Sequence, residues 1–171
     1  PGSVGIGVSP EVFSGKEFRM RWLALVCLLM VSEEGSAAST LAAQEPLAES
    51  RQETTPAGTR FMAPAGWRLV RLEGGVVLAP PEDGSHIVVI DVTGADAGEA
   101  VAAAWEGSGL AMPWPVKLSA EQAPYDGWDL VHIFDYDVPR NERRFVTAAA
   151  HRAAGQWTVV LLNMDRAVLE K

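Results

Sequence analysis

The sequence predicts an α+β domain in which helices pack on an antiparallel β-sheet. Three features indicate this class: a continuous β-branched run at 87–93, one stretch with a helical period between Asp96 and Gly109, and three alternating segments joined by short turns after residue 127. Short connections favour antiparallel neighbours. We therefore expect a single domain over residues 59–171 with the element order β-β-β-α-β-β-β-α.

The first part of the predicted domain consists of strands and tight turns. A Pro-x-Gly turn at 64–66 separates two short strands, because Pro restricts φ and Gly tolerates positive φ. The second strand continues to Leu72, and Gly74-Gly75 turns the chain into a return strand at 76–79. The run at 87–93 follows, and its continuous apolar character predicts a strand buried on both faces.

The middle of the chain predicts one amphipathic helix and a long loop. Asp96 and Glu99 are three residues apart, which resembles a capping box. The apolar residues of one helical face are Ala100, Val101, Ala104 and Trp105. Residues 110–127 contain three prolines, so we expect a long ordered loop with a short strand near 116–118.

The last third predicts three antiparallel strands at 128–136, 144–152 and 156–163. In the first of them alternation places five side chains on one face, which is the predicted core face: Trp128, Leu130, His132, Phe134 and Tyr136. Asp165 is the predicted N-cap of a final helix. That helix has room for about one turn before Lys171, so we expect the domain to be truncated at its C-terminus.

Three segments precede the predicted domain. Residues 1–19 do not begin with Met and show no helical or strand period, so we expect a non-native or disordered leader. Residues 20–43 combine a basic start, the apolar run at 22–31 and small residues before position 43, which is typical of a secretory signal peptide. The run is too short for the roughly 20 residues of a membrane span. Residues 44–58 are polar and predict a disordered tether.

Composition narrows the function classes further. The chain has 14 basic and 22 acidic residues, a net charge of −8, and no basic cluster, which excludes nucleic acid as a partner. Cys27, the only cysteine, lies inside the signal segment. The mature chain therefore has no disulfide, thiolate nucleophile or Cys-ligated zinc, and we expect it to be exported to the periplasm or the extracellular space without a membrane span.

The sequence contains no motif of a known catalytic site. It has neither Ser-x-x-Lys nor Gly-x-Ser-x-Gly, and a triad built on Ser85 needs side chains from separate strands to converge. The donors suited to a metal ion are His86, His132, Asp135 and His151. No paired spacing such as His-x-x-x-His connects them. We expect these to be ordinary sheet residues, and we predict no catalytic residue, no metal and no cofactor.

Three residues are candidates for contacts with a partner. Trp114 lies between two prolines in the long loop, where we expect an exposed indole, and Tyr125 belongs to the same loop. Arg140 lies in an acidic hairpin, where it either receives an anionic partner or pairs locally with Asp137 and Glu142. We favour the local pairing for its charge.

The pattern Phe61-x-x-Pro64-x-Gly66-Trp67, the hairpin after it, the helix ending near Trp105 and the closing strands with Trp157 resemble the PsbP-like fold. In particular, residues 59–171 resemble the non-catalytic N-terminal domain that precedes a β-lactamase-type serine hydrolase domain in some exported bacterial proteins. The resemblance implies that a catalytic domain with its Ser-x-x-Lys nucleophile lies beyond Lys171 and is absent from this chain.

Two functions remain open at this point. The first is a non-catalytic accessory domain that docks against an attached or neighbouring hydrolase domain through the 110–127 loop and one sheet face. The alternative is a free-standing periplasmic protein that binds a small ligand or a metal, or acts as a weak hydrolase, through His132, Asp135 and the other histidines. The reading frame beyond codon 171 distinguishes them.

Overall fold

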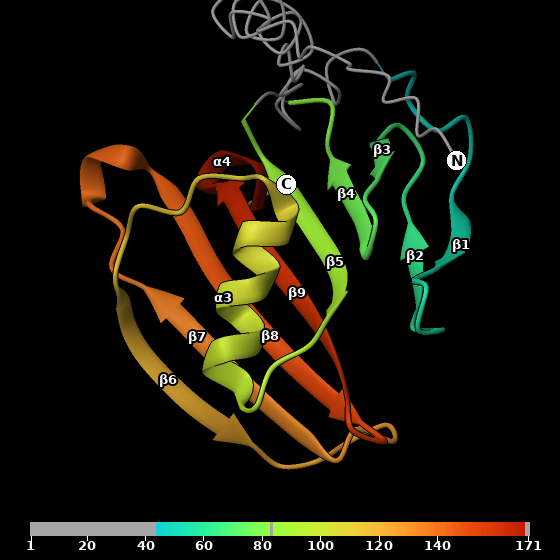
Figure 1. Ribbon diagram of the computed structural model, residues 1–171. Coiled ribbons are helices and arrows are strands. Elements are labelled where there is room, and N and C mark those ends of the chain that lie inside the picture. Colours follow the sequence, from blue (N-terminus) through green and yellow to red (C-terminus); the bar gives the residue numbers. More distant parts are fainter. Residues whose placement is uncertain (1–43, 83, 170–171) are drawn as a thin grey trace, which may run out of the picture. The chain divides into compact units, whose positions relative to one another are not determined.

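The computed structural model describes residues 44–82 and 84–169 of the chain, and within them an antiparallel sheet with the strand order β3-β4-β5-β9-β8-β7-β6 (Figure 1). The predicted leader at 1–19 and signal peptide at 20–43 lie outside the described residues. The strands are β3 (Arg68–Arg71), β4 (Gly75–Ala79), β5 (His86–Val92), β6 (Val116–Gln122), β7 (Leu130–Tyr136), β8 (Arg144–Ala153) and β9 (Gln156–Asp165). No helix within the described ranges has the length and apolar character to cross a membrane.

One crossover determines the order of the strands. Strands β3, β4 and β5 follow one another as antiparallel neighbours, and helix α3 (Ala97–Ser108) then carries the chain to the far edge of the sheet. Strands β6 to β9 return from that edge one after another, so β9 pairs with β5. The three strands predicted in the last third are confirmed as β7, β8 and β9.

Strand β6 corrects the prediction of a long loop at 110–127. It spans seven residues rather than a short piece near 116–118, and it pairs along β7. All of its residues except Ala120 are exposed, because β6 is an edge strand. The ladder with β7 stabilises it without a buried face, so no alternation of apolar residues marks it in the sequence.

Helix α3 covers one face of the sheet (Figure 1) and forms as its sequence predicts. The Asp96 Oδ1 atom accepts a hydrogen bond from the Glu99 N–H at 2.9 Å, and Gly109 ends the helix with a φ of 65°. The predicted apolar face is buried against β5, β8 and β9. Trp105 donates from Nε1 to the Tyr136 hydroxyl at 2.8 Å, which satisfies the polar atom of a buried indole.

A two-stranded sheet, β1 (Arg51–Thr54) and β2 (Arg60–Ala63), forms a second core with the other face of β4 and β5. This corrects the predicted disordered tether at 44–58, because β1 is part of it. Glu53 of β1 is only 7% exposed and accepts hydrogen bonds from Arg51 at 2.7 Å and Arg71 at 2.6 Å. Burial alone would raise the pKa of Glu53, but the two guanidinium groups outweigh it and lower the pKa.

Two short helices complete the described structure. The 3-10 helix η1 (Arg140–Glu142) lies between β7 and β8, and α4 (Arg166–Leu169) directly follows β9. The predicted cap of the last helix is confirmed, because Asp165 Oδ1 accepts from the Ala167 N–H at 2.8 Å. Helix α4 packs on β9. It therefore stands at the same end of the sheet as the start of β6 and β8.

Candidate functional site

The four residues considered as metal ligands do not converge. His132 pairs with Ala150 on the α3 face of the sheet, whereas Asp135 and His151 lie on the opposite face by alternation. His86 stands at the start of β5, in register with Asn163. Among the described residues no three His, Cys, Asp or Glu side chains lie close enough to hold a metal ion.

Ser85 and His86 lie at the start of β5, where their neighbours are groups that hold the strand ends together. The pKa of His86 is lowered to about 4, mainly by burial and further by the nearby Arg144 guanidinium. Arg144 donates from Nε to Asn163 Oδ1 at 2.6 Å and also contacts the Gly84 carbonyl oxygen. The Ser85 hydroxyl accepts a hydrogen bond from the Asp165 N–H at 2.9 Å. That bond ties Ser85 to the end of β9 and pairs it with no histidine.

His132 borders a cavity of about 290 Å³ beneath the first turn of α3. Its ring stacks on Phe134 with the ring centroids 4.7 Å apart, and Arg152 lines the same cavity above the Trp157 ring. These contacts connect β7, β8 and β9 beneath the helix. They place His132 in a packed aromatic region, as the predicted core face requires.

The structure corrects the predictions for two contact residues, Trp114 and Arg140. Trp114 is half-buried and packs against the core under α3, so its indole is not the exposed contact we expected. The segment leading into β6 lies over that core, and an indole there removes apolar surface from water. Arg140 is exposed in η1, and within the described residues it forms no ion pair with Asp137 or Glu142.

Tyr125 is exposed in the loop before β7 and forms part of an aromatic group. Its hydroxyl lies 3.1 Å from His151 Nε2, and the Trp128 ring lies 5.1 Å from the His151 ring. Burial lowers the pKa of His151, although backbone hydrogen bonds oppose the shift. The contact role predicted for Tyr125 remains a prediction, but the structure shows that its hydroxyl already has a partner within the domain.

Four exposed apolar residues, Val116, Leu118, Phe145 and Leu169, lie toward the other end of the strands. A cleft of about 300 Å³ lies between the start of β6, the end of β7, the start of β8 and α4. We call it the α4 cleft, and its lining residues are Lys117, Leu118, Asp135, Tyr136, Asp137, Val138, Arg144, Phe145, Val146 and Arg166. Leu118 is 59% exposed and Phe145 is 38% exposed, so the cleft offers some apolar surface to a partner.

The register of the sheet brings these two side chains to one face. Leu118 of β6 is opposite Asp135 of β7, which is opposite Thr147 of β8. Phe145 is two residues before Thr147 and so shares its face. Neither residue was a predicted contact residue, because Leu118 ended a short strand predicted within the long loop and Phe145 was one apolar residue of an internal strand.

Comparison with known proteins supports the fold alone. The chain matches no protein-family model and no curated protein. It is similar in structure to cyanobacterial PsbP (CyanoP) from Synechocystis sp. PCC 6803, known from its solution structure, with a TM-score of 0.50 and 15% sequence identity. The match covers 72% of this chain and 85% of that protein. The PsbP-like fold expected from the sequence is therefore confirmed as a fold.

Proposed function

We propose that this domain is a non-catalytic interaction domain of an exported protein and that it docks against a serine hydrolase domain through the α4 cleft. The observation that carries the proposal is the exposure of Leu118 and Phe145 beside a cleft on one end of the sheet. The resemblance to domains that precede a hydrolase supports the identity of the partner. The signal peptide predicted at 20–43 supports export.

The chemistry of the cleft is that of a protein interface. An apolar centre with a polar rim is the usual arrangement at such interfaces. Here Leu118 and Phe145 supply apolar area, and Lys117, Asp135 and Arg166 supply charges of both signs at the rim. In the described part of the chain these three charged side chains form no ion pair. They are therefore free to pair with a partner of complementary charge.

The two apolar side chains also contribute free energy to the proposed docking. Burial of a large apolar side chain contributes roughly 1.5–3 kcal/mol, so Leu118 and Phe145 supply a substantial part of a domain–domain contact. A charged residue at either position opposes that burial, because an unpaired charge is costly to remove from water. In the isolated domain Leu118→Asp has a small effect because Leu118 is 59% exposed, whereas Phe145→Asp also removes packing from a side chain that is only 38% exposed.

The first experiment is to read the gene beyond codon 171 and to express the complete product. We expect an in-frame domain with Ser-x-x-Lys followed by Tyr-x-Asn. Hydrogen exchange of the complete protein should then show slower exchange at 116–118 and 143–147 than in this chain alone. A stop codon near 171, or identical exchange in both proteins, would refute docking to an attached hydrolase.

Paired substitutions locate the contact. Leu118→Asp combined with Phe145→Asp should remove the protection in the complete protein, and thermal unfolding of this chain with both substitutions checks that the domain still folds. Met62→Asp is the matched control, because Met62 is 62% exposed on β2 and does not line the cleft. If the control abolishes the protection as completely as the double variant, the α4 cleft is not the docking surface.

A further inference from the structure

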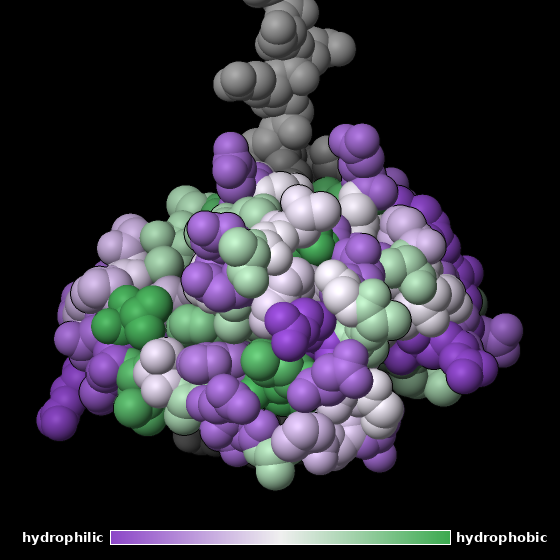
Figure 2. All heavy atoms as spheres, turned by 60° about the horizontal axis from the view of Figure 1, so that its bottom comes forward, coloured by the Kyte–Doolittle hydropathy of each residue, from purple (hydrophilic) through white to green (hydrophobic). Residues whose placement is uncertain are grey.

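A larger cavity, of about 510 Å³, lies at the opposite end of the strands from the α4 cleft. The loop between β1 and β2, the turn before β7 and the turn between β8 and β9 surround it. We call it the Trp128 groove. Figure 2 brings this end of the domain forward and shows hydrophilic and hydrophobic residues interspersed over it. Its volume lies within the range of about 300–1,000 Å³ that is common for small-molecule sites.

The floor of the groove is a fixed network of polar groups. Thr158 is 2% exposed, and its hydroxyl donates to Asp91 Oδ1 at 2.8 Å and lies 2.9 Å from the Thr59 hydroxyl oxygen. The Ala57 N–H donates to the second Asp91 oxygen at 2.6 Å. Both carboxylate oxygens therefore have donors, and the β1–β2 loop is tied to the sheet. The floor is polar, but it demands no cation to balance Asp91.

Trp128 is the aromatic residue of the groove, and its ring is supported by neighbouring rings. Trp128 lines the groove, and its ring also packs on His151, whose Nε2 lies 3.1 Å from the Tyr125 hydroxyl. The backbone N–H of Trp128 donates to the Tyr125 carbonyl oxygen at 2.9 Å. Asp126 and Gly127 take φ values of 50° and 85° in the turn that this bond closes. These contacts hold the indole in place before any ligand arrives, which lowers the entropic cost of binding.

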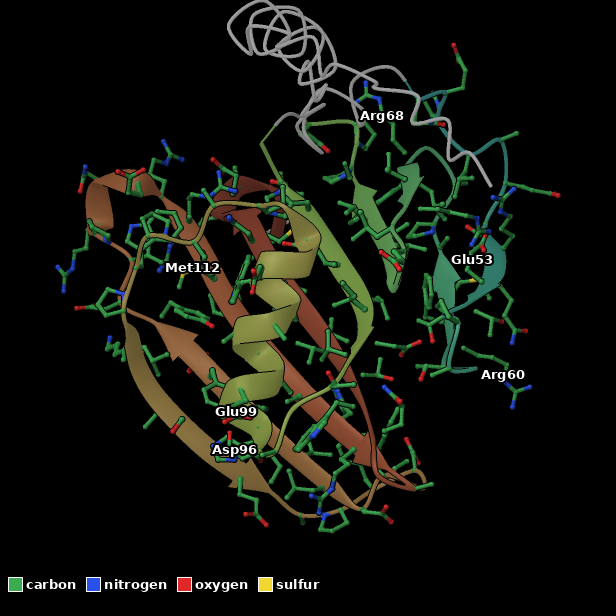
Figure 3. The ribbon with its side chains drawn as sticks, in the orientation of Figure 1. Glu53, Arg60, Arg68, Asp96, Glu99 and Met112 are labelled. Carbon is green, nitrogen blue, oxygen red and sulfur yellow. The ribbon has the colours of Figure 1, made fainter. Side chains whose placement is uncertain are left out.

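The groove offers no cation to a negatively charged ligand. Its lining contains one acid, Asp126, and one base, Arg60. Arg60 extends outward from the start of β2 (Figure 3), so no cation occupies the centre. Gln156 adds an amide whose nitrogen already donates to the Val92 carbonyl oxygen, which leaves its oxygen as an acceptor. The lining thus combines an aromatic residue with several hydrogen-bonding groups, and with the Asp126 and Asp91 carboxylates but no cation at its centre it disfavours an anion.

We propose that the Trp128 groove binds a neutral oligosaccharide. A pyranose ring has one apolar C–H face and a rim of hydroxyl groups. The indole of Trp128 matches that face, and Asp126, Gln156 and the Thr59 hydroxyl match the rim. An anionic ligand finds no convergent cations here, and a wholly apolar ligand would bury unpaired polar groups. This inference is independent of the docking proposed for the α4 cleft.

The test is a titration of the whole chain, labelled with nitrogen-15, with tetra-N-acetylchitotetraose and separately with cellotetraose, both of which are neutral. We expect saturable shifts of amide signals confined to 57–60, 126–128 and 153–158, together with the indole N–H signal of Trp128. Asp126→Asn should weaken binding several-fold without unfolding the domain, because Asp126 is exposed. Trp128→Ala should weaken it by about tenfold or more, equivalent to about 1.4 kcal/mol, and Trp128→Phe should restore part of the loss.

Met62→Ala is the control, since Met62 is exposed on the same β1–β2 sheet but does not line the groove. Thermal unfolding of each variant checks that the fold is intact. The proposal is overturned if neither sugar shifts these signals up to its solubility limit. It is also overturned if Trp128→Ala and Asp126→Asn, both folded, bind as tightly as the unchanged chain, or if an uncharged extended peptide fills the groove while both sugars do not.

Discussion

The half-buried imidazole of His86 makes the stability of this domain sensitive to mild acid. In the folded domain the pKa of His86 is lowered to about 4, first by burial and then by the Arg144 guanidinium. Within the described structure its Nε2 atom is buried and has no hydrogen-bond partner. A proton added there would create a cation next to Arg144 and an N–H without an acceptor, so protonation favours the unfolded chain.

The magnitude follows from the difference between the two states. In the unfolded chain His86 takes up a proton as the pH falls below its ordinary pKa of 6.5, whereas in the folded domain it stays neutral until the pH approaches 4. Linkage between protonation and folding then lowers the free energy of unfolding by about 2 kcal/mol at about pH 5 and by about 3 kcal/mol at about pH 4, relative to neutral pH. The loss is progressive over this window.

Urea unfolding at about pH 7 and about pH 5 measures the effect in the unchanged chain and in His86→Gln. Lowered pKa values of His151 and Glu53 also reduce stability in acid, but they act equally in both proteins and cancel in the comparison. We expect the unchanged chain to lose about 2 kcal/mol more than the variant over this interval. Equal losses in the two proteins, repeated with His86→Leu, would refute the reasoning.

Three further predictions concern stability, each measured by urea unfolding. Glu53→Gln should lower the free energy of unfolding by about 1–3 kcal/mol near neutral pH. Because the folded pKa of Glu53 is lowered below 4.5, this difference between the two proteins should shrink in acid. A difference that stays constant with pH would contradict the ion pairs. Gly75→Ala should lower the free energy of unfolding by more than about 3 kcal/mol, because its Cβ would lie 2.1 Å from a β5 carbonyl oxygen. Gly58→Ala, at a φ of 97° but in open space, should lower it by about 1–2 kcal/mol. Equal losses would be inconsistent with the close approach at Gly75. Tyr136→Phe should cost about 1–3 kcal/mol, because it leaves the buried Trp105 N–H without an acceptor, and an unchanged near-ultraviolet tryptophan signal would argue against that bond.

Local patterns were enough to locate most of the sheet and its main helix. The run at 87–93, the Gly74-Gly75 turn and the three closing strands appear in the structure within one to two residues of the predicted bounds. Helix α3 follows its cap and its apolar face. In each case the signal lies in neighbouring residues, because alternation, helical period and turn chemistry act over a few positions.

Strand β1 and all of β6 beyond its first three residues escaped prediction for a different reason. Each is polar or exposed along most of its length, and each is stabilised by groups far away in the sequence. Glu53 is buried because Arg71 of β3 meets it, and β6 is a strand because β7 supplies its hydrogen-bond partners. The residues next to such a strand in the sequence carry no signal for a partner that comes close to it only in the folded domain.

The same distinction separates the candidate sites. Sequence alone determined that this chain contains no Ser-x-x-Lys or Gly-x-Ser-x-Gly motif, carries a net charge of −8 and predicts an antiparallel sheet with a helix on it. The tertiary structure decided that His132 and His151 lie on opposite faces, that Trp114 packs inward and that Leu118 and Phe145 line one cleft. Residue types and spacing act along the chain, but a site needs side chains from several strands, and only the register and crossover of the sheet bring those together.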